Sequence, residues 1–202
     1  MEEPRYRRRK EDRPDEITAA ALSAFAEYGY AATRVEEVAK RAGVSKGLLY
    51  LYFQTKEELF KAVIRSVVIP RVDALELALD QSTLSAEAFL RGPMLHFMQG
   101  IPGSPVGIVV RLMIAEAHRH PDLVDYYWQN VVSRGLAALQ RILDRGVENG
   151  EFRRTAVNEF PHLLIAPVIL SVIWKLLFEN RLLDTDRLIE CHIDMILNDI
   201  KA

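Results

Sequence analysis

Apolar residues recur at helical spacing along most of the chain, in stretches that glycine, proline, serine or threonine separate. No stretch shows the sustained alternation of apolar and polar residues that is typical of a β-strand. The first stretch predicts a helix over 13–28 with one apolar face. Gly29 is expected to end this helix, because glycine readily adopts the left-handed conformation that follows many helices.

Two shorter helices are predicted from the residues that would cap them. Thr33 and Glu36 have the spacing of a capping box, in which Thr33 caps the second helix and Glu36 bonds back to it. Gly43 is expected to end that helix, and Ser45 is expected to cap the third.

A second capping box, Thr55 with Glu58, predicts the start of a fourth helix that continues toward Leu79. Pro70 lies inside it, so a kink or break is expected there, because proline removes one hydrogen bond and clashes with the preceding turn. A hinge and a static kink would both explain this irregularity.

The rest of the chain also predicts helices and no sheet, over residues 86–99, 104–119, 121–149, 158–179 and 185–200. The expected fold is therefore all-α, with about nine helices. The longest apolar stretch, Leu163–Phe178, contains Pro167 and Lys175, so we interpret it as a buried helix and not as a membrane span.

Composition narrows the class of protein. The 202 residues, half of them apolar, are enough for one large domain or two small ones with an ordinary core. The net charge of -2 argues against a polybasic nucleic-acid binder, although a local basic patch can still bind DNA. Cys191 is the single cysteine, which excludes an intrachain disulfide. Residues 1–13 are charged and lack the apolar centre of a signal peptide, so we expect a cytoplasmic protein. We also expect no membrane partner and no cofactor.

The clearest chemical signal lies in residues 33–53. Two short capped helices are joined by Ala42-Gly43-Val44-Ser45, which is the spacing of a helix-turn-helix, since glycine permits the tight turn and valine fills the core behind it. The second helix presents hydroxyl groups, an ammonium group and the bare backbone of Gly47, all of which suit DNA. An ordinary corner between two helices with a solvated face has the same generic pattern.

A longer set of residues agrees in identity and in spacing with one known domain: Ile17, Ala20, Phe25, Gly29, Tyr30, Thr33, Val38, Ala39, Ala42, Gly43, Val44, Ser45, Gly47, Leu49, Tyr50, Tyr52, Phe53, Lys56, Glu57 and Leu59. This segment resembles the DNA-binding domain of the tetracycline-repressor (TetR/AcrR) family of bacterial transcriptional regulators. The resemblance implies a helix-turn-helix domain over 1–60 with a basic N-terminal arm. It implies a helical effector-binding and dimerisation domain over 61–202.

By that resemblance, operator DNA is the expected partner, and Thr33, Tyr50 and Lys56 contact its phosphates. The other residues expected at the DNA surface are Arg34, Ser45, Lys46, Gly47, Leu48 and Tyr52. Leu48 departs from the family, which often has threonine there; leucine cannot hydrogen-bond a base edge and can read DNA only by apolar contact, for example with a thymine methyl group.

The N-terminal arm is rich in both basic and acidic residues. Similar arms in the family reach into the minor groove, where arginine is attracted to narrow, negative sites. The arm residues expected to do so are Arg7, Arg8, Arg9 and Lys10. Because nearby acids dilute this charge, a solvated disordered tail is the alternative.

Methionine and aromatic residues are frequent between residues 86 and 128. Such a set is commonly plain core, but the resemblance makes part of it the wall of a cavity for a largely apolar or aromatic effector. The residues expected to bind the effector are Met94, Phe97, Met98, Val109, Met113, Glu116, Tyr127, Trp128 and Trp174. Glu116 and His120 share a helix face, as metal ligands can, but a histidine at a helix end before Pro121 explains the pattern more simply, and no metal is expected.

The last two predicted helices carry more leucine, isoleucine and valine than one helix face can bury. In the family such a pair forms a four-helix interface, and paired DNA half-sites require a two-fold dimer. We therefore expect a homodimer through these helices.

These features favour a ligand-responsive transcriptional regulator, and specifically a repressor that a small molecule releases from its operator. The sequence contains no Gly-rich phosphate loop and no nucleophile elbow, so neither enzyme activity nor a catalytic residue is expected. The remaining alternative is a helical protein-interaction module in which the helix-turn-helix is only structural.

Overall fold

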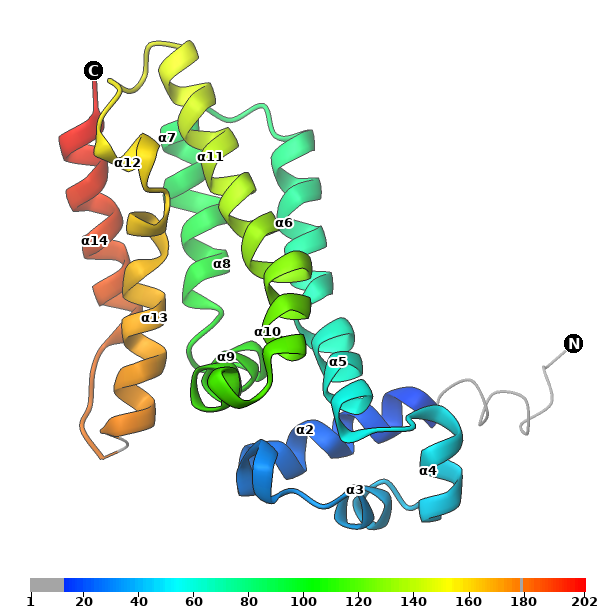
Figure 1. Cartoon of the computed structure of the whole chain (residues 1–202). Coiled ribbons are helices and arrows are strands. Elements are labelled where there is room, and N and C mark those ends of the chain that lie inside the picture. Colours follow the sequence, from blue (N-terminus) through cyan, green and yellow to red (C-terminus); the bar gives the residue numbers. More distant parts are fainter. Residues whose placement is uncertain (1–12, 179) are drawn as a thin grey trace, which may run out of the picture.

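The structure is a computed structural model, and it describes residues 13–178 and 180–202 (Figure 1). Within these ranges the regular secondary structure is helical, apart from one isolated β-bridge between Phe152 and Lys201, which confirms the all-α class. None of the described helices has the length and apolar character needed to cross a membrane. The predicted arm residues Arg7, Arg8, Arg9 and Lys10 lie outside the described residues.

The N-terminal helices form a small unit at one end of the molecule, α2 (Arg13–Ala32), α3 (Val35–Arg41) and α4 (Lys46–Tyr52), which α5 (Lys56–Val67) joins to the rest (Figure 1). Gly29 has φ 77° and ψ 166°, so the helical conformation breaks there as expected. One more helical turn follows this kink, and α2 therefore extends past the predicted end of the helix.

The capping predictions succeed at two positions and fail at one. The Ser45 hydroxyl accepts a hydrogen bond from the Leu48 amide (3.1 Å), and the Thr55 hydroxyl accepts one from the Glu58 amide (3.0 Å). The predicted capping box at Thr33 is wrong, because Arg34 occupies the N-cap position of α3 without a side-chain bond. The Thr33 hydroxyl instead donates to the carbonyl of Gly29 (2.6 Å), one of the carbonyls that a helix end leaves without a partner.

The break predicted at Pro70 is confirmed. Helix α5 ends at Val67, and α6 (Ile69–Gln81) begins two residues later with Pro70 in its first turn, where the missing amide costs no helical hydrogen bond. The predicted domain boundary between residues 60 and 61 falls inside α5. One continuous helix therefore connects the two predicted domains.

The remaining helices lie beside α6, most of them upright in the view of Figure 1, with α9 at the base of the bundle. They are α7 (Ala86–Phe89), η1 (Leu90–Met94), α8 (Leu95–Gln99), α9 (Pro105–Glu116), η2 (Ala117–Arg119), α10 (Pro121–Tyr127), η3 (Trp128–Val132), α11 (Ser133–Glu148), α12 (Ala156–Glu159), α13 (His162–Leu177) and α14 (Thr185–Ile200). The helix predicted over residues 86–99 is interrupted by the π-helical turn η1, which contains Pro93. A second π-helical turn, η3, had no sequence signal, and such turns occur frequently at functional sites.

The buried apolar residues form two clusters. One cluster joins α2 and α5 to α9 and α10, with Phe25, Phe60 and Leu112 among its members. The other lies inside the bundle, between α6, α7, α8, α11, α13 and α14. Because α9 and α10 share a core with the N-terminal unit, a movement of these helices acts directly on that unit.

Candidate DNA-binding surface and effector cavity

Helix α4 turns one side to the core and the opposite side to solvent. Leu49 is buried, and Leu51, two residues later and therefore about 200° around the helix, is 82% exposed. Gly47 shares this outer face, and Leu48 lies half-buried at its flank. Leu51 is not among the residues predicted at the DNA surface, although its spacing from the apolar residue Leu49 was a sufficient signal.

Several polar groups predicted to meet DNA already have partners within the protein. Lys46 forms an ion pair with Glu36 of α3, and its ammonium group lies 5.8 Å from the ring centre of Tyr50. The Ser45 hydroxyl caps α4. The predicted DNA residues that the structure places at the exposed surface are Arg34, Ser45, Lys46, Gly47 and Tyr50, and Tyr52 is half-buried beside the ring of Phe53.

Thr33 and Lys56, which are both predicted to contact phosphates, have side chains that face the protein. Thr33 is 3% exposed. The Lys56 ammonium donates to the carbonyl oxygens of Tyr30 (2.8 Å), Ala31 (3.0 Å) and Thr33 (3.3 Å), which occupies its three N–H groups. Burial lowers the pKa of Lys56, while the charge of Glu116 opposes this shift. The physical reason is that the end of α2 presents unpaired carbonyls, and these two side chains supply the donors.

A polar joint connects α9 and α10 to α2. One carboxylate oxygen of Glu116 accepts a hydrogen bond from the Ala31 amide (3.4 Å), and the other is buried without a hydrogen-bond partner among the described residues. Arg111 donates to the carbonyl of Ala26 (3.0 Å), and the His120 ring packs edge-on against Tyr30 at 4.7 Å. Glu116 therefore contacts the N-terminal unit and is not among the residues that line the cavity described next.

The possible metal pair also lies at this joint. The closest Glu116 and His120 side-chain atoms are 4.0 Å apart. No group of three or more potential ligands occurs in the part of the chain that the structure describes. The two side chains have ordinary structural contacts there.

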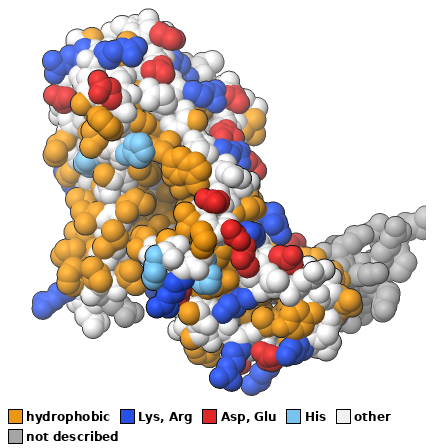
Figure 2. All heavy atoms as spheres, viewed as in Figure 1, with side chains coloured by type: hydrophobic (Ala, Val, Ile, Leu, Met, Phe, Trp, Pro, Cys, Tyr) orange, Lys and Arg blue, Asp and Glu red, His pale blue; other side chains and the backbone are white. Residues whose placement is uncertain are grey.

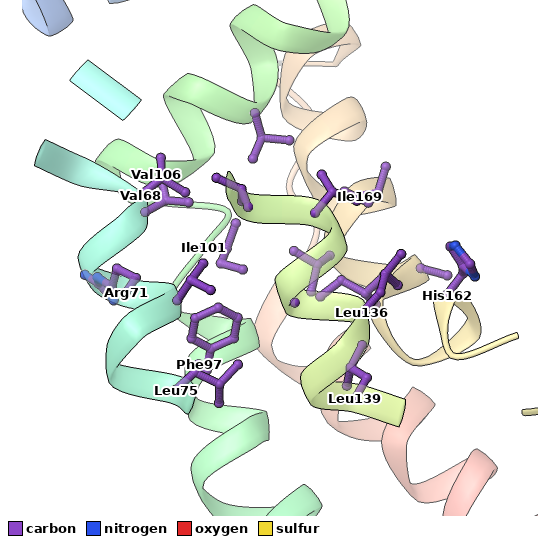
Figure 3. A pocket seen from close by; sticks show the side chains of 18 of the residues that line it. Val68, Arg71, Leu75, Phe97, Ile101, Val106, Leu136, Leu139, His162 and Ile169 are labelled. Atoms are coloured by element: carbon purple, nitrogen blue, oxygen red, sulfur yellow. The ribbon is translucent and has the colours of Figure 1, made fainter. Parts of the chain in front are cut away.

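A cavity of about 600 Å³ lies between α6, α8, α9, α11 and α13 (Figure 3). Among its lining residues only Arg71, Tyr127 and His162 have polar side chains, and the polar ends of Arg71 and His162 point away from the centre in Figure 3. The apolar lining residues are Val68, Val72, Leu75, Met94, Phe97, Ile101, Val106, Val110, Val131, Val132, Leu136, Leu139, Ile165, Ala166, Val168, Ile169, Leu170 and Ile173. Gly135 completes the wall, and a Cβ atom placed on it would meet no atom within 4 Å.

Tyr127 contributes the one polar group of the α10 wall. Its hydroxyl has no hydrogen-bond partner among the described residues, and burial raises its pKa to about 12. An unpaired hydroxyl beside an apolar space is a ready donor or acceptor for a bound molecule.

Three of the predicted effector residues line the cavity, namely Met94, Phe97 and Tyr127. The others lie elsewhere, because helical periodicity identifies residues that point inward but not those that border empty space. Met98 and Val109 are fully buried in the two cores, and Met113 lies beside Leu123 near the polar joint. Trp128 is 51% exposed, and the Trp174 indole donates to the Arg181 carbonyl outside the cavity.

The cavity opens beside α13. His162, Ala166, Ile169 and Leu170 line it and are also exposed to solvent. Figure 2 shows the corresponding hollow, bordered by hydrophobic side chains, between α13 and α10–α11.

A second apolar surface runs along α13. Leu163, Leu170 and Leu177 are spaced seven residues apart and are 42%, 49% and 63% exposed. Met195 of α14 is 67% exposed, and His192 of the same helix lies 2.6 Å from the Leu163 carbonyl. Such a row of exposed leucines is typical of a helix that packs against another helix.

Comparison with known proteins assigns the family. The profile for "Bacterial regulatory proteins, tetR family" matches residues 17–63, and the profile "Tetracyclin repressor-like, C-terminal domain" matches residues 85–191. The Fatty acid metabolism regulator protein of Bacillus subtilis is 28% identical over 147 residues, 71% of this chain and 74% of that protein. The HTH-type transcriptional repressor KstR2 of Mycolicibacterium smegmatis is 29% identical over 142 residues, 70% of this chain and 68% of that protein.

Solved structures show the same fold. The Bacillus subtilis regulator FadR in complex with stearoyl-CoA aligns with a TM-score of 0.74 at 21% identity, over 90% of this chain and 96% of that one. The C-terminal profile alone spans more than half of the present chain. Two family profiles, a helix-turn-helix unit and a helical bundle with an apolar cavity thus agree: the chain belongs to the tetR family of bacterial transcriptional regulators.

Proposed function

We propose that this protein is a repressor that binds operator DNA as a homodimer and leaves it when an apolar small molecule fills the cavity. The observation that carries this proposal is the position of the cavity. Its lining includes Val106 and Val110 of α9, and the same helix ends at the polar joint with the N-terminal unit.

The DNA-binding surface is assigned to the exposed sides of α3 and α4. Arg34 and Tyr50 are exposed there, and both can reach phosphates. Lys46 is exposed beside them, and DNA competes with Glu36 for its ammonium group. We assign no DNA contact to the side chains of Thr33 and Lys56, whose hydrogen bonds lie within the protein.

The lining of the cavity selects the class of effector. It contains no carboxylate, so a cation would be buried without a partner, at considerable cost. At about 30 Å³ per atom of liquid, the space holds about 20 non-hydrogen atoms. A largely apolar molecule with one polar group near Tyr127 fits these features, and a long acyl chain, such as the one in the FadR complex, is the first candidate. The lining also lacks a paired nucleophile and base, which favours binding over catalysis.

The connection between ligand and DNA runs through α9. A ligand that pushes on Val106 and Val110 moves a helix whose Arg111 and Glu116 hold α2 by hydrogen bonds to its backbone. The recognition helix packs on the unit that α2 anchors. Release then follows if the ligand binds more tightly to the arrangement that does not fit the operator.

We assign the dimer contact to α13 and α14. Exposed apolar side chains lie on both helices, the leucine row on α13 and Met195 on α14, and two copies of this surface can meet about a two-fold axis. This contact would place the recognition helices of two subunits on one operator, as paired half-sites require.

Titration of operator DNA with the dimer, followed by addition of stearoyl-CoA, tests the proposal. We expect specific DNA binding, and we expect release by stearoyl-CoA but not by choline, whose cation the cavity cannot pair. Binding to operator and random DNA with the same affinity would overturn the regulatory function. The effector assignment would be overturned if choline released the operator, or if neither stearoyl-CoA nor any other apolar compound that is tested did so.

A further inference from the structure

The outer face of α4 is apolar where it would meet the base pairs. Gly47 and Leu51 lie opposite the buried Leu49, so they occupy the middle of the exposed face. Leu48, three residues before Leu51, adds a second leucine to the same side. Leu51, which is 82% exposed, can form no hydrogen bond through its side chain.

The polar side chains around these leucines are engaged within the protein or stand at the edge. Lys46 is paired with Glu36, and the Ser45 hydroxyl holds the Leu48 amide. Tyr50 lies about 100° from Leu49, at the flank of the face. Hydrogen-bond readout by the middle of this helix has no donor or acceptor to rely on.

Leu51 lies in the middle of the proposed DNA-binding face and is 82% exposed. Its apolar surface therefore stays in water, which is unfavourable, unless DNA covers it. The major groove offers one apolar group, the C5-methyl group of thymine. We propose that Leu51, together with Leu48, recognises operator DNA by packing against thymine methyl groups. This inference rests on the proposed DNA-binding function and adds the chemical basis of its sequence preference.

The missing side chain at Gly47 is consistent with this contact. A Cβ atom at Gly47 would meet no protein atom within 4 Å, so the glycine is not required by packing inside the protein. It leaves the helix surface low beside Leu51, and the leucine can approach the floor of the groove. The operator is therefore expected to carry thymine, or an equivalent methylated base, near the centre of each half-site.

Replacement of thymine by deoxyuridine tests the proposal, because deoxyuridine lacks only the methyl group. Binding sites are first selected from random duplexes with the full-length protein, and each thymine is then replaced in both half-sites. We expect at least one position where affinity falls about fourfold per half-site, and about fifteenfold for the pair, which is the loss of one buried methyl group in each. Exchange of that thymine for cytosine or 5-methylcytosine should show the same preference for the methylated base.

Variants assign the effect to the leucines. In Leu51→Ala the affinities for thymine and deoxyuridine duplexes should become equal at that position, whereas Leu77→Ala, which changes a leucine of α6 that is 55% exposed, should keep the difference. The proposal is overturned if no thymine methyl group matters, or if Leu51→Ala and Leu48→Ala both retain the wild-type difference. If no duplex is enriched in the selection, the proposed DNA-binding function fails first, and this inference with it.

Discussion

Gly135 offers a direct test of where the effector binds. It lies inside α11, lines the cavity, and has open space where a side chain would begin. Substitution by alanine should raise the free energy of unfolding by about 1 kcal/mol, because glycine is the weaker helix former. For a chain of this size, that gain corresponds to a Tm about 2–4 °C higher.

A larger side chain at the same position should compete with the ligand for space. Gly135→Leu adds four carbon atoms to the cavity, and a ligand that gives up four such contacts loses about 3 kcal/mol, or about a hundredfold in Kd. Gly135→Ala adds one carbon atom and should cost about fourfold. Both variants should bind operator normally without effector, so the repressor becomes difficult to induce and keeps its DNA affinity.

Thermal unfolding at one fixed protein concentration measures both effects. A ligand at about a hundred times its Kd stabilises the wild-type protein by about 2.7 kcal/mol, and the same concentration should stabilise Gly135→Leu by only about 0.4 kcal/mol. The ligand for this measurement is stearoyl-CoA, or another apolar compound that is found to release the operator. Ala137→Leu introduces the same residue at an exposed position of α11 and should leave ligand affinity unchanged.

Two results would refute the reasoning about Gly135. Wild-type ligand affinity in Gly135→Leu would show that the effector binds outside this cavity. Loss of folding in Gly135→Ala would show that the space beside the glycine is absent in solution.

Three further predictions concern Lys56, two buried tyrosines and the dimer. In urea titrations, Lys56→Met should lower the free energy of unfolding by about 1.5 kcal/mol. This value is the lower end of the range for hydrogen bonds of charged groups, because the ammonium group is partly exposed. The same variant should leave the salt dependence of operator binding unchanged. If the slope of the logarithm of affinity against the logarithm of salt concentration flattens by about one, Lys56 does contact a phosphate. Burial raises the pKa of Tyr30 and Tyr127 from 10.0 to about 12, so between these pH values the folded chain holds protons that the unfolded chain has lost. Stability should therefore fall as the pH rises through this window, and less steeply when both tyrosines are changed to phenylalanine; equal slopes would contradict the assignment. Leu163→Glu should give monomers in sedimentation, while Leu84→Glu, at a similarly exposed leucine, should remain dimeric; the reverse would exclude the α13 surface.

The sequence by itself determined the features that depend on near neighbours. The helical spacing, the caps at Ser45 and Thr55, and the break at Pro70 all involve interactions within about four residues, and the structure has each of them. The family was recognisable for the same reason, since residues 17–60 keep their spacing whatever packs against them.

Tertiary structure decided the features that depend on distant partners. Thr33 and Glu36 have the spacing of a capping box, but the Thr33 hydroxyl bonds to carbonyls of the preceding helix. Lys56 carries the positive charge expected of a phosphate contact, yet its ammonium group donates to carbonyls 23 to 26 residues away. Glu116 looked like a polar group of the cavity, and its partner is an amide 85 residues earlier.

The cavity shows the same limit most clearly. Periodicity identified the inward side of each helix, and three of the residues predicted to bind the effector, Met94, Phe97 and Tyr127, line the empty space. It could not distinguish them from Met98 or Val109, which also point inward but meet other side chains. Whether an inward residue touches a neighbour or a void depends on how far apart the helices stand, and only their packing in three dimensions determines that distance.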